Sequence, residues 1–287
     1  NRVESLSIGA RAASSIGEYS LTATGRLGLG DLHPNLELAA TRASLKRTLS
    51  LRLHHSLESV DPQTDPFGLG NSASALLFGR DDCEYYRASG ASLSFAPPAN
   101  SRASWLVTFF AQHDEDVERN TNITLRKLWN GDFRFRPNIV AASTELYGAA
   151  IGLRPWWGTD PTGVQAGLDM HLEAATGGFE FARARLTARA AAPLFAKLRI
   201  GVEAGAGTAE GDVPPQRLWF LGGAASLRGY DASTLAGTSF ARARAGHLDR
   251  PVAEAELRPM AEMSKQASPA LFRAERFAWR ITMNGGL

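Results

Sequence analysis

The sequence predicts an all-β protein whose antiparallel strands form a barrel in a membrane. Three observations predict this class. Apolar and polar residues alternate with the period of a β-strand in many segments of the chain. These segments reach about nine to thirteen residues, nearer the ~9–11 residues of a tilted membrane strand than the ~5–6 of a globular one. Their polar faces carry charged side chains, which a water-filled interior accepts and a dry sandwich core does not.

The clearest strand is "TGVQAGLDMHLEA", residues 162–174, in which apolar and polar residues alternate without a break. Its apolar face holds Val164, Ala166, Leu168, Met170 and Leu172, and its polar face holds Gln165, Gly167, Asp169, His171 and Glu173. The segments "RTLSLRLHHSLE" (47–58) and "AKLRIGVEAG" (196–205) repeat the pattern. Alternation also places His54 and His55 on opposite faces of their strand, so the two cannot bind one metal ion together.

Residues 179–191, "FEFARARLTARAA", test the assignment, because Ala and Arg are good helix formers. As a strand, the segment gathers Arg183, Arg185, Thr187 and Arg189 on one face, whereas a helix would scatter them. The period therefore favours a strand. Residues 239–247, "SFARARAGH", reuse the pattern and predict a second strand of this kind.

Further strands are expected along the whole chain, giving about fourteen to sixteen in all and no convincing amphipathic helix. In order, they are residues 3–10, 19–30, 35–44, 85–96, 104–112, 122–129, 132–140, 144–153, 251–259 and 277–285. Longer polar loops are expected at 59–72, 111–121 and 207–216, and short turns elsewhere. Short turns at one end and long acidic loops at the other are typical of an outer-membrane barrel.

Composition excludes several classes. The formal net charge is only +2 and no run of like charges occurs, so nothing indicates nucleic-acid binding. No segment approaches the ~20 consecutive apolar residues of a membrane helix. Cys83 is the sole cysteine, which excludes an internal disulfide, and we interpret it as a bystander thiol. The pairs Trp156–Trp157 and Tyr85–Tyr86 are interpreted as parts of an aromatic girdle at the membrane interface.

No signature of an enzyme is found. Hydrolase, metalloprotease and nucleotide-binding motifs are absent from the sequence. The nearest is "GAGTAEG" (205–211), which we interpret as a flexible loop because no helix follows it to receive a phosphate. Asp169, His171 and Glu173 share one strand face, and we interpret them as solvated residues of the barrel interior instead of a metal site. We therefore expect no catalytic residues, no metal and no cofactor. A secreted β-sandwich remains the soluble alternative.

The stretch "FLGGAASLRGY" (220–230) is unusual, because a glycine-rich apolar run is followed by an arginine at a point where no strand pattern continues. Gly222 and Gly223 allow a tight fold-back, and Leu227 and Tyr230 supply apolar contacts on either side of the Arg228–Gly229 pair. If the guanidinium of Arg228 is buried away from water, it needs a carboxylate as its partner. We expect a loop, about residues 208–237, that folds into the barrel interior.

These residues resemble the BamA, TamA and two-partner-secretion transporter superfamily of outer-membrane assembly and translocation barrels, the bacterial surface antigen family. Its hallmark is a Val/Leu/Ile-Arg-Gly-Phe/Tyr tetrad, here Leu227–Tyr230, after a Gly-Gly-x-x-Ser lead-in. The segments 79–95 and 1–10 also resemble upstream strands of this family. The resemblance implies sixteen strands and a late extracellular loop folded into the lumen. It also implies Glu256 as the partner of Arg228, with Glu254 as the alternative.

The resemblance further implies a function at the bacterial outer membrane in the insertion, assembly or translocation of proteins. Expected partners are outer-membrane lipids and lipopolysaccharide, unfolded or partly folded client proteins, and periplasmic or outer-membrane accessory subunits. A passive porin-like or anchoring barrel is the alternative. A third reading is the barrel part of a longer protein with an N-terminal enzymatic domain.

The sequence also departs from the family pattern. Only 57 residues follow Tyr230 (287 − 230), the family's Phe-x-Asp-x-Gly strand is not found, and the chain ends "MNGGL" without a terminal aromatic residue. Residues 1–287 are expected to be barrel throughout, with no POTRA or enzymatic domain within them. Either the chain is part of a longer protein, or it is a reduced member of the family.

Overall fold

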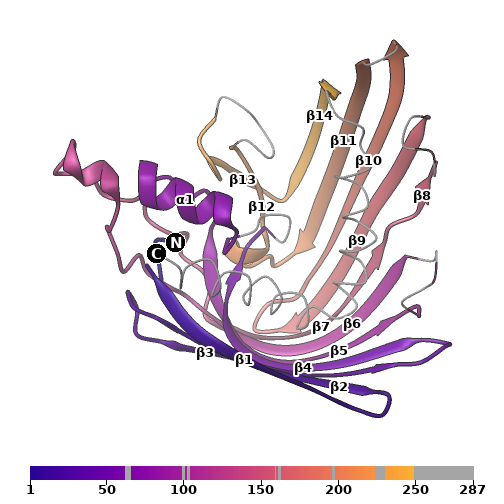
Figure 1. Cartoon of the computed structure of the whole chain (residues 1–287), viewed down its shortest axis with the longest axis horizontal. Coiled ribbons are helices and arrows are strands. Elements are labelled where there is room, and N and C mark those ends of the chain that lie inside the picture. Colours follow the sequence, from indigo (N-terminus) through magenta and orange to yellow (C-terminus); the bar gives the residue numbers. More distant parts are fainter. Residues whose placement is uncertain are drawn as a thin grey trace.

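A strongly curved, antiparallel β-sheet makes up most of the protein (Figure 1). The computed structural model describes residues 1–61, 66–98, 101, 104–158, 160, 163–195, 198–223 and 230–248. Within them, each long strand pairs with its neighbour in the sequence, in the order β1-β2-β3-β4-β5-β6-β7-β9-β10-β11-β14. The short β8 pairs only with β9, and β12 and β13 form a separate hairpin. The predicted all-β class is confirmed, whereas closure and a count of sixteen strands stay predictions.

The long strands span ten to fifteen residues. Their bounds are β1 Ser7–Ile16, β2 Tyr19–Gly28, β3 Pro34–Ala43, β4 Thr48–Ser59, β5 Tyr85–Ala96, β6 Trp105–Glu115, β7 Thr144–Leu153, β9 Gln165–Gly177, β10 Phe181–Phe195, β11 Leu198–Gly211 and β14 Ser239–Leu248. The short elements are β8 Trp156–Trp157, β12 Trp219–Leu221, β13 Leu235–Gly237, helix α1 Leu69–Phe78, and the 3-10 helices η1 Leu125–Leu128 and η2 Pro215–Arg217.

The two faces of the sheet differ in chemistry, as the alternation predicts. On β4, Leu51 and Leu53 are exposed on the convex face, while Ser50 and His54 are buried on the concave one. The register carries this division from strand to strand. Exposed apolar side chains on the convex face include Ile8, Leu21, Leu27, Leu36, Leu38, Leu51, Leu53, Phe109, Ile151, Leu172, Leu186, Ile200 and Val202. A continuous apolar surface of this extent is unusual for a water-soluble monomer.

The two ends of the sheet also differ. Connections at one end, the turn end, are short and include 17–18, 44–47 and 154–164. Three long connections, 60–84, 116–143 and 212–238, gather at the opposite end, the loop end. The predicted asymmetry is therefore present. Among the described residues, no helix is long and apolar enough to cross a membrane.

Helix α1 corrects the expectation of a helix-free chain, since residues 69–72 read as loop in the sequence. Gly79, at a φ of 66°, caps the helix and donates its backbone N–H to the carbonyl of Ala75. Thr124 Oγ1 donates to the carbonyl of Leu76 at 2.9 Å, which fixes the helix to the segment before η1.

Two expected strands at the loop end are wrong. Residues 122–129 form a turn and η1, because Thr124 Oγ1 accepts from the backbone N–H of Arg126 and starts a helical turn. In residues 132–140 apolar and polar side chains alternate, but backbone N–H groups donate to side chains instead of to a neighbouring strand. The N–H of Phe135 donates to Asn122, and that of Ile139 donates to Glu84.

The N-terminal residues lie within this loop end. Arg2 is fully buried and donates to Glu84 Oε2 at 2.5 Å, and its backbone N–H donates to Asp81 Oδ2 at 2.7 Å. Arg136 forms a second ion pair with Glu84. Cys83 is buried beside Val3 and the end of β4, consistent with an inert thiol. The ion pairs tie residues 1–4 to the connections 60–84 and 116–143.

Candidate functional site

The connection 212–238 folds back over the concave face of the sheet (Figure 1). It begins after Gly211, because β11 stays paired with β10 up to Phe181–Gly211. The segment 205–211, expected to be a flexible loop, is therefore strand. The Asp212 N–H donates to the carbonyl of Glu180 at 2.8 Å, which fixes the start of the connection.

Two prolines direct the connection inward. Pro214 is extended and fully buried, and Pro215 opens η2, where its fixed φ and missing donor suit the first helical position. The N–H of Arg217 donates to the carbonyl of Pro214 at 2.8 Å. This tight turn presents the side chains of Gln216 and Arg217 to the concave wall.

Arg217 is the centre of the site. Its Nη1 donates to Tyr86 Oη at 2.8 Å, its Nη2 donates to Asp114 Oδ2 at 3.2 Å, and its Nε lies 3.5 Å from Glu173 Oε1. These partners come from β5, β6 and β9. The arginine is 7% exposed. Burial alone lowers its pKa, but Tyr86, Glu173 and Asp114 outweigh burial and raise the pKa above the ordinary value, so Arg217 stays charged.

Gln216 and Arg183 complete the arrangement. Gln216 is fully buried, and its side-chain amide exchanges two hydrogen bonds of 2.9 Å with the backbone of Ala142. Arg183 Nη2 donates to Glu173 Oε2 at 2.6 Å, and its Nη1 donates to the carbonyl of Arg217 at 3.1 Å. We call Tyr86, Asp114, Glu173, Arg183, Gln216 and Arg217 the loop clamp.

The loop clamp balances two arginines against two carboxylates in a buried place. Such a cluster fixes one geometry, because each charge left without its partner carries a desolvation cost. Trp219 continues the contact, since Arg183 lies 5.2 Å from its ring and Phe240 of β14 packs edge-on against it. The arrangement anchors a segment to the wall.

The predicted motif falls between β12 and β13 in the sequence, and most of it lies outside the described residues. Gly222 and Gly223 have φ of 129° and 83°, and the N–H of Gly223 donates to the carbonyl of Tyr230 at 3.0 Å. Tyr230 is exposed. Leu227, Arg228 and Gly229, together with Glu254 and Glu256, lie outside the described residues, so their pairing stays a prediction.

Several sequence interpretations need correction. Asp169 and Glu173 are not simply solvated: Arg154 and Arg185 pair with Asp169, and Arg183 pairs with Glu173. Among the described residues, no three His, Cys, Asp or Glu side chains are grouped to hold a metal ion.

The aromatic girdle is also wrong in part. Tyr85 and Tyr86 are buried and bound to Asp81 and Arg217, so neither lies at an interface. Trp157 is exposed beside Ala166, but Trp156 lies on the other face, where its ring covers Gly167.

The sequence did not single out Gln216 and Arg217. A sequence signal for an anchored turn was present, since "PPQR" places two conformationally restricted prolines before two long polar side chains, and an apolar run follows. Asp114 was missed because 111–121 read as loop, whereas β6 continues to Glu115.

Comparisons with known proteins return outer-membrane structures at low similarity. No family model matches the chain, and no curated protein does. The crystal structure of BamA from Haemophilus ducreyi lacking POTRA domains 1–3 aligns at 15% identity and a TM-score of 0.48, over 84% of this chain and 52% of that one. OmpT of Vibrio cholerae, an outer membrane protein solved as a trimer, aligns at 12% identity and 0.39, over 84% and 64%.

The chain thus spans about half to two thirds of the length of these structures. Likeness at this level assigns neither a family nor an activity to the chain.

Proposed function

We propose that this chain forms the wall of a bacterial outer-membrane β-barrel that inserts or translocates other proteins. The observation that carries the proposal is the loop clamp, which anchors the connection 212–238 to the concave wall through the buried Arg217. An anchored inward segment restricts the interior, as expected of a barrel that handles polypeptides and not of an open diffusion pore.

The membrane location is supported by the two faces of the sheet. The convex face presents exposed Leu, Ile, Val and Phe side chains on nine of the long strands, and the concave face carries hydroxyl and charged groups. In lipid, strands are stable only where their backbone groups pair with other strands, and an apolar outer band provides the contact with acyl chains.

The protein-handling role is supported by the clamp together with the sequence of the same connection. The connection that carries Arg217 also carries the Leu227–Tyr230 tetrad, which resembles that of the assembly and translocation superfamily. No cofactor is needed for such a role, because folding of the client supplies the free energy.

The proposal is tested with the purified chain in vesicles of phosphatidylethanolamine and phosphatidylglycerol. An unfolded small outer-membrane barrel is added as client, and its folding is followed by heat-modifiable migration on gels. We expect faster client folding than in empty vesicles, and loss of the acceleration in Arg217→Ala. Equal rates in empty vesicles and in vesicles holding the wild-type chain would contradict the proposal and leave the passive barrel.

A further inference from the structure

Six arginines gather on the concave side of the sheet between the loop clamp and the turn end. They are Arg154, Arg185, Arg189, Arg199, Arg242 and Arg244, and we call them the arginine face. Asp169 and Glu203 form ion pairs with them. The six arginines outnumber the two carboxylates with which these ion pairs are described.

The remaining sequence holds no acid excess to neutralise this face. Residues 249–287 contain six basic and five acidic residues. The concave side of β2 to β4 carries hydroxyl groups, including Thr22, Thr41 and Ser50. Its arginines, Arg26 and Arg52, are held in ion pairs with Glu4, Glu37 and Glu58.

The register spaces the arginines regularly. Arg189 of β10 lies opposite Glu203 of β11, which lies opposite Arg244 of β14. One step nearer the loop end, Arg242 lies opposite Gly205, and one step further Arg185 lies opposite Gly207. Each step is two residues along a strand, or about 6.6–6.8 Å. Alternate side chains of an extended peptide have the same repeat.

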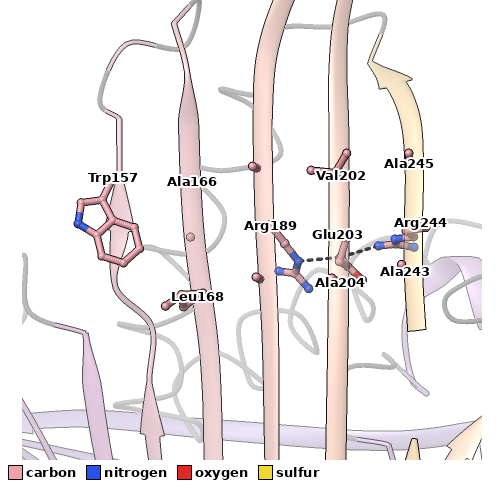
Figure 2. A pocket seen from close by; sticks show the side chains of 13 residues that line it. Trp157, Ala166, Leu168, Arg189, Val202, Glu203, Ala204, Ala243, Arg244 and Ala245 are labelled. Atoms are coloured by element: carbon pink, nitrogen blue, oxygen red, sulfur yellow. Dashed lines mark hydrogen bonds and ion pairs between the residues drawn. The ribbon is translucent and has the colours of Figure 1, made fainter. Parts of the chain in front are cut away.

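The arginines bind oxygen acceptors wherever their contacts are defined. Figure 2 shows Arg189 and Arg244 converging on the carboxylate of Glu203, at 2.8 and 2.9 Å. Arg199 Nη2 donates to the carbonyl of Gly163 and to Gln165 Oε1. Arg189 and Arg244 remain 44% and 48% exposed while holding Glu203, so both can reach a further acceptor.

One more observation points to a ligand with oxygen acceptors. Arg185 has only 8% of its side chain exposed, and its Nε makes no hydrogen bond within the described residues.

We propose that the arginine face binds an extended acidic segment of polypeptide, with carboxylates at alternate positions. The ligand lies along β10, β11 and β14 and pairs first with the half-exposed Arg189 and Arg244. Binding requires only the folded wall, so it is independent of the insertion or translocation proposed above and is measured without any client reaction.

The test uses the full chain in detergent and fluorescent peptides of about twelve residues, long enough to span several of the two-residue steps between arginines. One peptide alternates Glu with Ser, the second groups the same glutamates in one block, and the third alternates Lys with Ser. We expect the alternating acidic peptide to bind most tightly, the lysine peptide not to bind, and affinity to fall at about 0.5 M salt. Arg189→Gln with Arg244→Gln should weaken binding about tenfold or more.

Two matched variants keep the test decisive. Arg42→Gln with Arg80→Gln removes two arginines of similar exposure, 51% and 56%, that lie outside the arginine face, and should leave binding unchanged. Arg189→Lys with Arg244→Lys keeps the charge and should retain most of the affinity, which separates lost binding from lost folding. The proposal is overturned if the glutamine variant binds like the wild type, or if the block peptide binds as tightly as the alternating one.

Discussion

At the scale of single residues, the connection 212–238 carries one arginine whose contacts are defined and one that lies outside the described residues. Arg217 has the role that the sequence suggested for Arg228: a buried guanidinium paired with carboxylates of the wall. Both arginines belong to the same connection, but composition alone could not show that Arg217 meets Asp114 and Glu173. That depends on the turn imposed by Pro214 and Pro215.

Removing Arg217 should destabilise the protein strongly. In Arg217→Ala, Asp114 and Glu173 lose a buried cation, and we expect unfolding to become easier by about 3–5 kcal/mol. Denaturant titration in detergent, followed by tryptophan fluorescence, measures the change. Arg42→Ala is the matched control, because its ion pair with Glu18 is exposed, and it should have no measurable effect. Equal stability of the two variants would mean that the clamp is not an anchor.

Arg228 is predicted to form a second anchor with Glu256. A double-mutant cycle of Arg228→Ala and Glu256→Ala should give a coupling energy well above ~1 kcal/mol, the upper range for exposed pairs. Glu254→Ala serves as the alternative partner and should couple less. If both glutamates give additive effects with Arg228, Arg217 is the sole anchor of the two.

At the scale of elements, the alternation of apolar and polar residues correctly predicted the strands that pair with neighbouring strands of the sheet. The expected β5 matches residue for residue, and the arginine-rich β10 is a strand despite its helix-forming composition, because it pairs on both edges with β9 and β11. Prediction failed at the loop end. There, backbone N–H groups that a strand would use for pairing donate instead to side chains such as Asn122 and Glu84. These acceptors are distant in the sequence, so no local pattern reveals them.

The hairpin tip should depend on Gly222. A Cβ there would lie 2.1 Å from the carbonyl oxygen of Asp231, at a φ of 129°. Gly222→Ala should therefore cost on the order of 1–3 kcal/mol locally and speed protease cleavage within the hairpin. Gly131→Ala, where a Cβ meets nothing within 4 Å, is the control. Unchanged cleavage in Gly222→Ala would show that the tip is not held in this conformation.

The two faces of β9 should differ in their surroundings. In a Cys83→Ser background, Leu172→Cys on the convex face should react with a lipid-soluble thiol reagent, and His171→Cys on the concave face with a water-soluble one. Leu172 is 46% exposed, and His171 contacts Glu173. Reversed reactivity would mean that the convex face is not the lipid face.

At the scale of the whole molecule, one curved sheet separates an apolar convex side from a polar concave side, and the long connections gather at one end (Figure 1). The loop clamp joins β5, β6, β9 and β10 to the connection 212–238 across the concave side. The central claim is that this inward segment is held in place and restricts the interior of a membrane barrel.

Single-channel recording in planar bilayers tests that claim most directly. The wild-type chain should insert and conduct little or only briefly, whereas Arg217→Ala should open more often and to severalfold higher conductance. Arg42→Ala, which leaves the clamp intact, should behave like the wild type. A large, steady conductance that is the same in all three proteins would contradict the account, because the clamped connection would then not restrict the interior.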